Sequence, residues 1–204
     1  MIKTKLRELF EHDRAYYDSG LGLVAGIDEA GRGPLAGPVV AAAVVLGAGV
    51  YIEGVNDSKK LSEARRRALL WEIVCRAADI GVGVVDAAEI DRVNILNATK
   101  AAMKEAVAQL NTSPDILLID AVKLPDIDIR QCSIIKGDAK SAAIAAASIV
   151  AKVVRDSLML AYHQQYPQYG FNAHKGYGTR YHIEAIRTHG PCDIHRRSFA
   201  PIRK

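Results

Sequence analysis

Acidic residues end several apolar runs of this sequence, and their positions could support chemistry. The run GLVAGID ends in Asp28 with Glu29 beside it, ILLID ends in Asp120, and SIIKGD ends in Asp138. Burying an unpaired carboxylate is costly, and converging carboxylates repel one another unless a cation neutralises them. Ligand sets made only of oxygen favour hard ions such as Mg²⁺ or Mn²⁺. The sequence therefore predicts a divalent-metal site at the ends of these runs.

The competing interpretation of such an acid is a helix N-cap. Asp86 fits it, because Glu89 follows three residues later, close to a capping box, and we assign Asp86 to capping. Asp120 is followed by AVKLPD, which has a proline and no helical pattern, so capping explains it poorly. Asp138 precedes a predicted helix, and both interpretations stay open for it.

The pair Asp28 and Glu29 raises a geometric requirement. Adjacent residues on a regular strand point to opposite faces, so both could not serve one site there. We therefore expect the strand to stop or bend at this pair. The glycines of the following AGRG permit such a bend.

Short apolar runs and helical patterns share the chain, which predicts an α/β protein with a central sheet. Glycine-rich turns and polar loops separate these elements, and helices accumulate towards the C-terminus. The predicted strands are residues 21–27, 38–46, 79–85, 116–120 and 133–135. A helical pattern follows Ser62 and reaches about residue 78, residues 86–109 are predicted to be mostly helical, and a long helix is predicted from 139 to about 160. A short helix is predicted to begin near Thr179.

Length and composition indicate one globular domain. The chain has 204 residues, of which 50% are hydrophobic and 25% charged. Its three widely spaced cysteines form no CxxC pair, which favours a reduced, cytoplasmic setting. The N-terminal segment is charged and unlike a secretory signal. Glycines and Pro38 interrupt the uncharged stretch at residues 35–52, so we expect no membrane span.

Basic residues concentrate towards the C-terminus. Residues 171–204 contain seven Lys or Arg against Glu184 and Asp193, a balance of +5 that leaves −1 for the remainder. Such a segment suggests a polyanionic partner, and a solvated helical face is the ordinary alternative. We expect residues 155–204 to form a basic, mainly helical and loop extension of the single domain 1–204 that binds substrate.

Motifs along nearly the whole chain resemble those of the ribonuclease HII family. A short glycine motif alone would be weak support, but seven ordered segments make the resemblance specific. The segments are DEAGRGP at 28–34, NDSKKLS at 56–62, NILNATKAAM at 94–103, LLIDAVKL at 117–124, KGDAKSAAIAAASIVAKVVRD at 136–156, YGFNAHKGYGT at 169–179 and HRRSFAP at 195–201.

The resemblance implies a ribonuclease H-like fold, with a mixed sheet flanked by helices and a helical C-terminal portion. It implies an endoribonuclease that cuts the RNA strand of RNA–DNA hybrids and cuts on the 5′ side of single ribonucleotides in duplex DNA. The expected mechanism uses two metal ions, Mg²⁺ or Mn²⁺, and leaves a 3′-hydroxyl and a 5′-phosphate. The catalytic set carried over is Asp28, Glu29, Asp120 and Asp138.

The resemblance also assigns substrate contacts. Gly31, Arg32 and Gly33 are expected to contact the ribose 2′-hydroxyl, which distinguishes RNA from DNA. Glycines would let the backbone approach a sugar closely, although an ordinary turn explains them too. Tyr177 is expected to pack on the sugar beside the scissile junction; its alternative is a loop aromatic that covers the core edge.

Five basic residues are plausible phosphate contacts, and each could equally be an ordinary surface charge. They are Lys59, Lys60, Lys152, Arg155 and Lys175. A zinc site is a poor interpretation of the C-terminal histidines and cysteine, because no second closely spaced pair completes a standard pattern. These residues are His174, His182, His189, Cys192 and His195, and we expect the histidines at the surface or against nucleic acid.

Two alternatives remain for the function. The first is a non-catalytic nucleic-acid-binding protein of the same fold, which the complete set of four acids disfavours. The second is the related ribonuclease HIII, whose additional N-terminal domain has no room in the twenty or so residues before the first strand. A monomer is expected. A replication or repair protein partner is not readable from the sequence.

Overall fold

A five-stranded mixed sheet forms the centre of the protein. The computed structural model describes residues 2–203, with side chains from residue 8 onward. The sheet has the order β3-β2-β1-β4-β5, in which β1 pairs antiparallel with β2 and parallel with β4. The strands are β1 (Leu23–Ala30), β2 (Val39–Gly47), β3 (Asp79–Val85), β4 (Ile116–Asp120) and β5 (Arg130–Ile134).

The three parallel strands explain why distant acids meet. β4 is parallel to both β1 and β5, so the carboxyl ends of all three lie at one edge of the sheet. Ile27 pairs with Ile119, which places Asp28 and Asp120 at equivalent positions one residue further on. Side chains alternate along strands, so both acids belong to the face that carries Val24 and Leu118.

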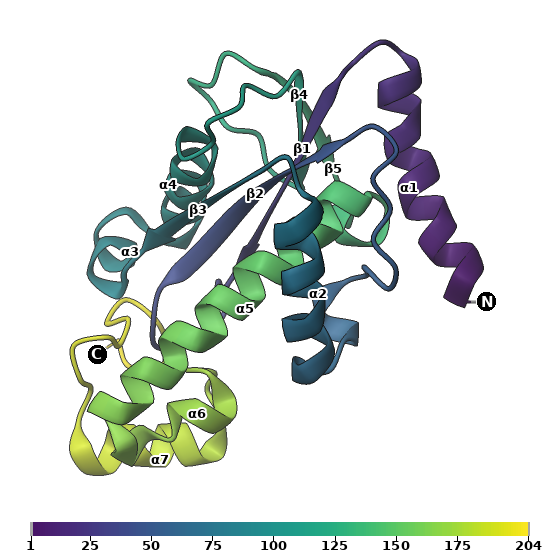
Figure 1. Cartoon of the computed structure of the whole chain (residues 1–204). Coiled ribbons are helices and arrows are strands. Elements are labelled where there is room, and N and C mark those ends of the chain that lie inside the picture. Colours follow the sequence, from purple (N-terminus) through teal and green to yellow (C-terminus); the bar gives the residue numbers. More distant parts are fainter. Residues whose placement is uncertain (1, 204) are drawn as a thin grey trace.

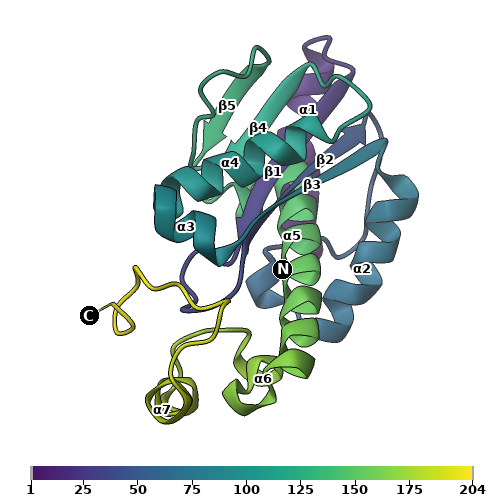
Figure 2. The same ribbon diagram turned by 90° about the vertical axis from the view of Figure 1, so that its left-hand side faces the viewer.

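Helices cover both faces of the sheet (Figures 1 and 2). The long helix α5 crosses one face diagonally, with α1 and α2 packed beside it, and α4 covers the opposite face next to α3. Each face has its own buried apolar cluster. The helices are α1 (Ile2–Asp18), α2 (Glu63–Arg76), α3 (Ala87–Val93), α4 (Ile95–Ala108) and α5 (Ala142–Gln165).

Alanines let α5 approach the sheet closely. Its buried face includes Ala143 and Ala147. A Cβ added at Gly26 of β1 would lie 2.0 Å from the carbonyl carbon of Ala143, so only glycine fits there. The strand that carries Asp28 and Glu29 is thus held against α5 by backbone contact.

Helix caps settle two of the earlier alternatives. Asp86 accepts a hydrogen bond from the Glu89 amide at the start of α3, which confirms its capping role. Ser141 caps α5 by accepting from the Ile144 amide, so Asp138 is not the cap of that helix. The Asp13 carboxylate of α1 accepts from the Ser141 hydroxyl and the Ala143 amide, and so ties α1 to the same helix end.

Two features of the helices go beyond the sequence prediction. Residues 86–109 are mostly helical, as predicted, but they form two helices, because Asn94 adopts φ 69° and its side chain begins α4 by accepting from the Leu96 and Asn97 amides. Residues 2–18 form α1, about which the sequence analysis made no prediction. Its packing against α5 supplies stabilisation that local sequence does not show.

The C-terminal portion is helical and lies at the far end of α5 (Figure 1). It contains α6 (Phe171–His174) and α7 (Arg180–His189), and Thr179 caps α7 as the sequence indicates. The short 3-10 helices are η1 (Ser58–Lys60), η2 (Gly137–Ala139) and η3 (Pro167–Tyr169). None of the helices described in residues 2–203 is long and apolar enough to cross a membrane.

Candidate active site

Strand β1 runs through the first two acids without the expected stop. It stays paired with β2 as far as Ala30, and only its pairing with β4 ends at Ile27. We expected a stop or a bend at Asp28 and Glu29, and the continued pairing with β2 excludes the stop. A strand between two neighbours can lose one ladder and keep the other, and both acids still interact electrostatically with Asp120.

Tight turns place the other two acids. Asp120 ends β4, and Ala121 then adopts a left-handed φ of 52°, which is uncommon outside glycine. The Asp120 Oδ1 accepts a hydrogen bond from the Gly137 amide at 2.8 Å, which draws the loop after β5 towards β4. Asp138 lies on η2 of that loop, with Lys59 Nζ 3.9 Å from its Oδ2.

Burial and crowding favour the neutral forms of these acids. Burial, followed by the charge of Glu29, raises the pKa of Asp28 well above its usual range. Burial also raises the pKa of Glu29, against the opposing effect of Arg32. The pKa of Asp138 is raised chiefly by burial and then by Asp57, with Lys59 opposing. The pKa values of three neighbouring carboxyl groups are thus raised, and a nearby cation would lower them again.

The donor set suits a hard divalent cation. Glu29 Oε2 is buried without a hydrogen-bond partner, which is an unusual arrangement for a carboxylate oxygen. Among the described residues, no three acidic, histidine or cysteine side chains are already arranged as a metal cage. Glu29 instead pairs with Arg32 at 3.3 Å, and Lys59 Nζ lies 3.9 Å from Asp138 Oδ2. Oxygen ligands are present, and small side-chain movements would free them.

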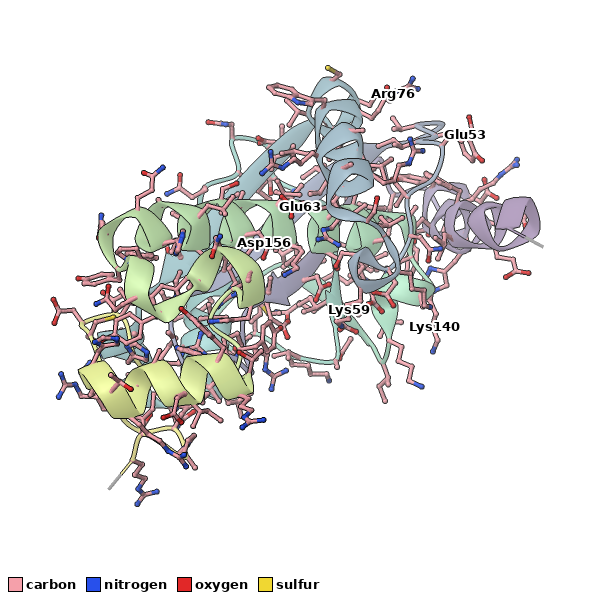
Figure 3. The ribbon with its side chains drawn as sticks, turned by 90° about the horizontal axis from the view of Figure 1, so that it is seen from below. Glu53, Lys59, Glu63, Arg76, Lys140 and Asp156 are labelled. Carbon is pink, nitrogen blue, oxygen red and sulfur yellow. The ribbon has the colours of Figure 1, made fainter. Side chains whose placement is uncertain are left out.

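A groove of about 360 Å³ is lined by the GRG turn and by one of the four acids, Glu29. Many of the predicted site residues line this groove, although they come from four separate parts of the chain. Its lining is Glu29, Ala30, Gly31, Arg32, Gly33, Ser58, Lys59, Ser148, Lys152 and Tyr177. Seen from below in Figure 3, Lys59 projects from η1 and Asp156 from α5.

Tyr177 projects at the end of this groove. Its side chain is exposed, and the Cβ of an alanine at Gly33 would lie 3.8 Å from its ring. Its carbonyl accepts from His182 Nδ1 at 2.9 Å, and His182 Nε2 lies 3.1 Å from His195 Nε2. His182 and His195 are fully buried, so the prediction that these two histidines lie at the surface is wrong.

Arg155 does not contact solvent, and the prediction that it binds phosphate is wrong. Its side chain is 1% exposed and donates to the carbonyl oxygens of Pro38, Ala36 and Lys175. A Cβ at Gly31 would lie 2.0 Å from Arg155 Nε, and Gly31 has φ +97°. Glycine is required there by the buried arginine and by backbone conformation, before any substrate is considered.

The predicted lysines have varied surroundings. Lys152 lines the groove but forms an ion pair with Asp156 at 2.6 Å. Lys60 lies outside the groove lining, 3.5 Å from Asp57. Lys175 Nζ donates to the Asn172 carbonyl. Lys59 is the most exposed of the four and borders both the groove and Asp138.

Sequence reasoning missed three residues of this region. Ser148 lines the groove, bonds Ser58 at 2.8 Å and lowers the pKa of Asp28 through a hydrogen bond. Arg196 is fully buried and holds the backbone of the GRG turn. The three residues, Ser58, Ser148 and Arg196, lie in segments that carried the family resemblance. Nothing in their local sequence indicates these contacts.

Comparison with known proteins decides the family. The sequence model described as Ribonuclease HII matches residues 25–202. The ribonuclease HII of Acetivibrio thermocellus is 59% identical over 94% of this chain and 75% of its own length. That of a Geobacillus species is 57% identical over 99% of this chain and 73% of its own length. The chain belongs to the ribonuclease HII family.

Ribonuclease HII is an endoribonuclease, so the chain is a phosphodiester hydrolase, and the alternative of a non-catalytic binding protein is excluded.

Solved structures confirm the predicted fold. The ribonuclease H2 of Pyrococcus horikoshii matches with a TM-score of 0.75 at 29% identity, covering 89% of this chain and 95% of its own. The Archaeoglobus fulgidus enzyme, solved as a PCNA:RNase HII complex, matches with a TM-score of 0.72 at 28% identity over 89% and 97%.

Proposed function

We propose that this ribonuclease HII cuts the RNA strand of RNA–DNA hybrids and cuts on the 5′ side of single ribonucleotides in duplex DNA. The observation that carries the proposal is that Glu29 of the acid set, the GRG turn and Tyr177 line one groove. Such a groove lets one substrate strand meet a hydrolytic centre, a backbone that can read a sugar and an aromatic ring.

Asp28, Glu29, Asp120 and Asp138 are the proposed ligands of Mg²⁺ or Mn²⁺. The unpartnered Glu29 Oε2 and the raised pKa of Asp28 support this assignment. When bound, two such ions would acidify the attacking water and stabilise the charge on the departing oxygen. The structure of Bst-RNase HIII in complex with Mn2+ has the same fold. Its TM-score is 0.65 at 23% identity.

The residues of the chain have separable parts in the hydrolysis. The water oxygen attacks phosphorus, the bond from phosphorus to the 3′-oxygen breaks, and protonation of that oxygen leaves a 3′-hydroxyl and a 5′-phosphate. The carboxylates would hold the cations, and Lys59 beside Asp138 would contact a phosphate. The Arg32 side chain pairs with Glu29 and would be released to contact substrate if Glu29 bound a cation.

The substrate preference is tested with two duplexes that differ in one 2′-hydroxyl. With Mg²⁺ or Mn²⁺, the duplex containing a single ribonucleotide should be cut on its 5′ side, and the all-DNA duplex should stay intact. Equal cutting of both duplexes would contradict the proposed reading of the ribose.

Replacing Asp120 with Asn tests the catalytic set. Asp120→Asn removes one ligand charge and should abolish turnover while hybrid binding stays largely intact. Asp126→Asn is the matched control, because Asp126 lies in the loop after β4, its side chain is 82% exposed and it pairs with Lys104. Cleavage rates and binding are measured for both folded variants. A near-normal rate for Asp120→Asn would show that the assigned metal centre is wrong.

The partners of the chain are a separate proposal. The nucleic-acid substrate follows from the groove, and the chain is expected to act as a monomer. The solved complex of the Archaeoglobus fulgidus enzyme with PCNA supports a replication protein as a further partner here.

A further inference from the structure

The side chain of Arg196 is committed to the backbone of the GRG turn. Its Nη2 donates to the Gly31 carbonyl at 2.6 Å and its Nη1 to the Arg32 carbonyl at 2.9 Å. Nε and Nη2 also donate to the Gly37 carbonyl, at the other end of the turn. The guanidinium carbon also lies 5.1 Å from the centre of the Phe199 ring.

Fixing a carbonyl also fixes the amide of the same peptide group. In a trans peptide the C=O and the N–H point in opposite directions. The Gly31 carbonyl shares its peptide with the Arg32 amide, and the Arg32 carbonyl shares its peptide with the Gly33 amide. Because Arg196 draws both carbonyls into the protein, both amides are turned away from it, on residues that line the groove.

These two amides are available to a ligand. Within the part of the chain that the structure describes, neither Arg32 nor Gly33 donates a backbone hydrogen bond. Adjacent outward amides form a site for an electron-rich oxygen, such as that of a sugar hydroxyl or a phosphate. Both Arg32 and Gly33 are exposed residues, so the turn that carries these amides faces solvent.

We propose that Arg196 is a specificity-determining positioning residue, which orients the Arg32 and Gly33 amides towards the ribose 2′-oxygen. This inference rests on the proposed reading of the ribose by the GRG turn. Arg196 itself does not touch substrate: it is fully buried behind the turn. Its loss should therefore reduce discrimination between ribose and deoxyribose, while the attraction of the protein for duplex DNA in general stays the same.

The backbone around Arg196 is anchored independently of its side chain. The Arg196 amide donates to the Leu35 carbonyl, and the amides of Arg197 and Ser198 donate to the Asp91 carboxylate. A substitution at position 196 thus removes the contacts to the turn and leaves the segment in place. Arg197 supplies the matched control, because it is the neighbouring arginine and its side chain is exposed.

The experiment compares Arg196→Met, Arg196→Lys and Arg197→Met with the unsubstituted protein. Affinity is measured by fluorescence anisotropy in EDTA, so that nothing is cut, for a duplex with one ribonucleotide and for its all-DNA counterpart. We expect Arg196→Met to lower the ratio of the two affinities roughly tenfold, because the Arg32 and Gly33 amides would no longer be oriented to donate hydrogen bonds to the ribose. Arg196→Lys should lower it less, and Arg197→Met should weaken both duplexes equally.

A second measurement reports on the turn without substrate. The amide ¹H–¹⁵N resonances of residues 31–33 should shift in both Arg196 variants and stay unchanged in Arg197→Met. Unshifted resonances in folded Arg196→Lys would overturn the proposal, as would an unchanged affinity ratio where the unsubstituted protein discriminates. If the unsubstituted protein itself fails to discriminate, the proposed ribose reading is what has failed, and the resonances alone decide whether Arg196 orients the turn.

Discussion

The negative charge of Asp28 serves the proposed metal site, but it lowers the stability of the folded protein. Burial raises its pKa, so the folded state prefers the neutral form and the ionised form is destabilising at neutral pH. The stabilisation that protonation brings is complete below the pKa of the unfolded chain. It is lost as the pH rises through the higher folded value. The same charge is what a metal cation needs.

Asp28→Asn should therefore stabilise the metal-free protein at neutral pH while abolishing cleavage. The gain in unfolding free energy over the unsubstituted protein should shrink as the pH falls through the raised pKa of Asp28. Chemical denaturation of both proteins across pH 4–8 measures this difference. The buried histidines titrate in both proteins, so their contribution to the unfolding free energy cancels in the comparison. A variant less stable at neutral pH would show that Asp28 is stabilising as a charge.

Tyr177 offers a second test at the residue scale. Packing of its ring against a sugar is worth roughly 1–3 kcal/mol, so Tyr177→Ala should lower kcat/KM by about ten- to a hundredfold. Tyr177→Phe should lose much less. The loss should be greatest on a single ribonucleotide in DNA, where the adjoining sugar is always deoxyribose.

Tyr181→Ala is the control for this experiment, because Tyr181 is also exposed but does not line the groove. Steady-state kinetics on both substrate types measures the effect. Equal losses for Phe and Ala at position 177 would assign the function to the hydroxyl. Equal losses on a hybrid and on a single ribonucleotide would make Tyr177 a general positioning residue.

At the scale of elements, the contact between β1 and α5 determines where the acids lie. Gly26→Ala would place a methyl group 2.0 Å from the backbone of Ala143, which cannot move aside as a side chain would. Overpacking of this kind costs about 1–3 kcal/mol or more. Thermal and chemical unfolding should show this loss, and cleavage should fall because β1 shifts relative to β4.

Gly47→Ala is the matched control, because its nearest neighbour would be a Val50 methyl group at 3.9 Å. It should leave stability within about 0.5 kcal/mol, as surface substitutions usually do. A Gly26→Ala protein as stable as Gly47→Ala would show that α5 can move away from the sheet without cost.

Local patterns predicted those elements whose signals are contained in their own residues. The strands at 79–85 and 116–120 agree with the structure, and so do the cap at Asp86 and the helix starts after Ser62 and near Thr179. The continuation of β1 through Glu29 was not predictable in this way, because it depends on β2 remaining as a partner. The break at Asn94 was missed because helical periodicity continues on both sides of it.

At the scale of the whole molecule, charge counting proved less informative than position. The C-terminal balance of +5 includes Arg196, and Arg155 was counted as a phosphate contact, yet both are buried on backbone carbonyls. No local pattern separates such arginines from surface ones, because their partners lie up to 165 residues away. The boundary proposed at residue 155 falls inside the continuous helix α5, and the substrate-binding extension stays a prediction.

The hydrogen bonds from Arg196 to the GRG turn connect two segments that are synthesised at very different times. Residues 28–33 leave the ribosome early, and Arg196 follows more than 160 residues later. Contacts so distant in sequence form late in folding. During synthesis the acids can therefore reach their strands before the turn gains its orientation. A nascent chain would thus place its carboxylates first, and selection of a ribose would arise only when the last segment has docked.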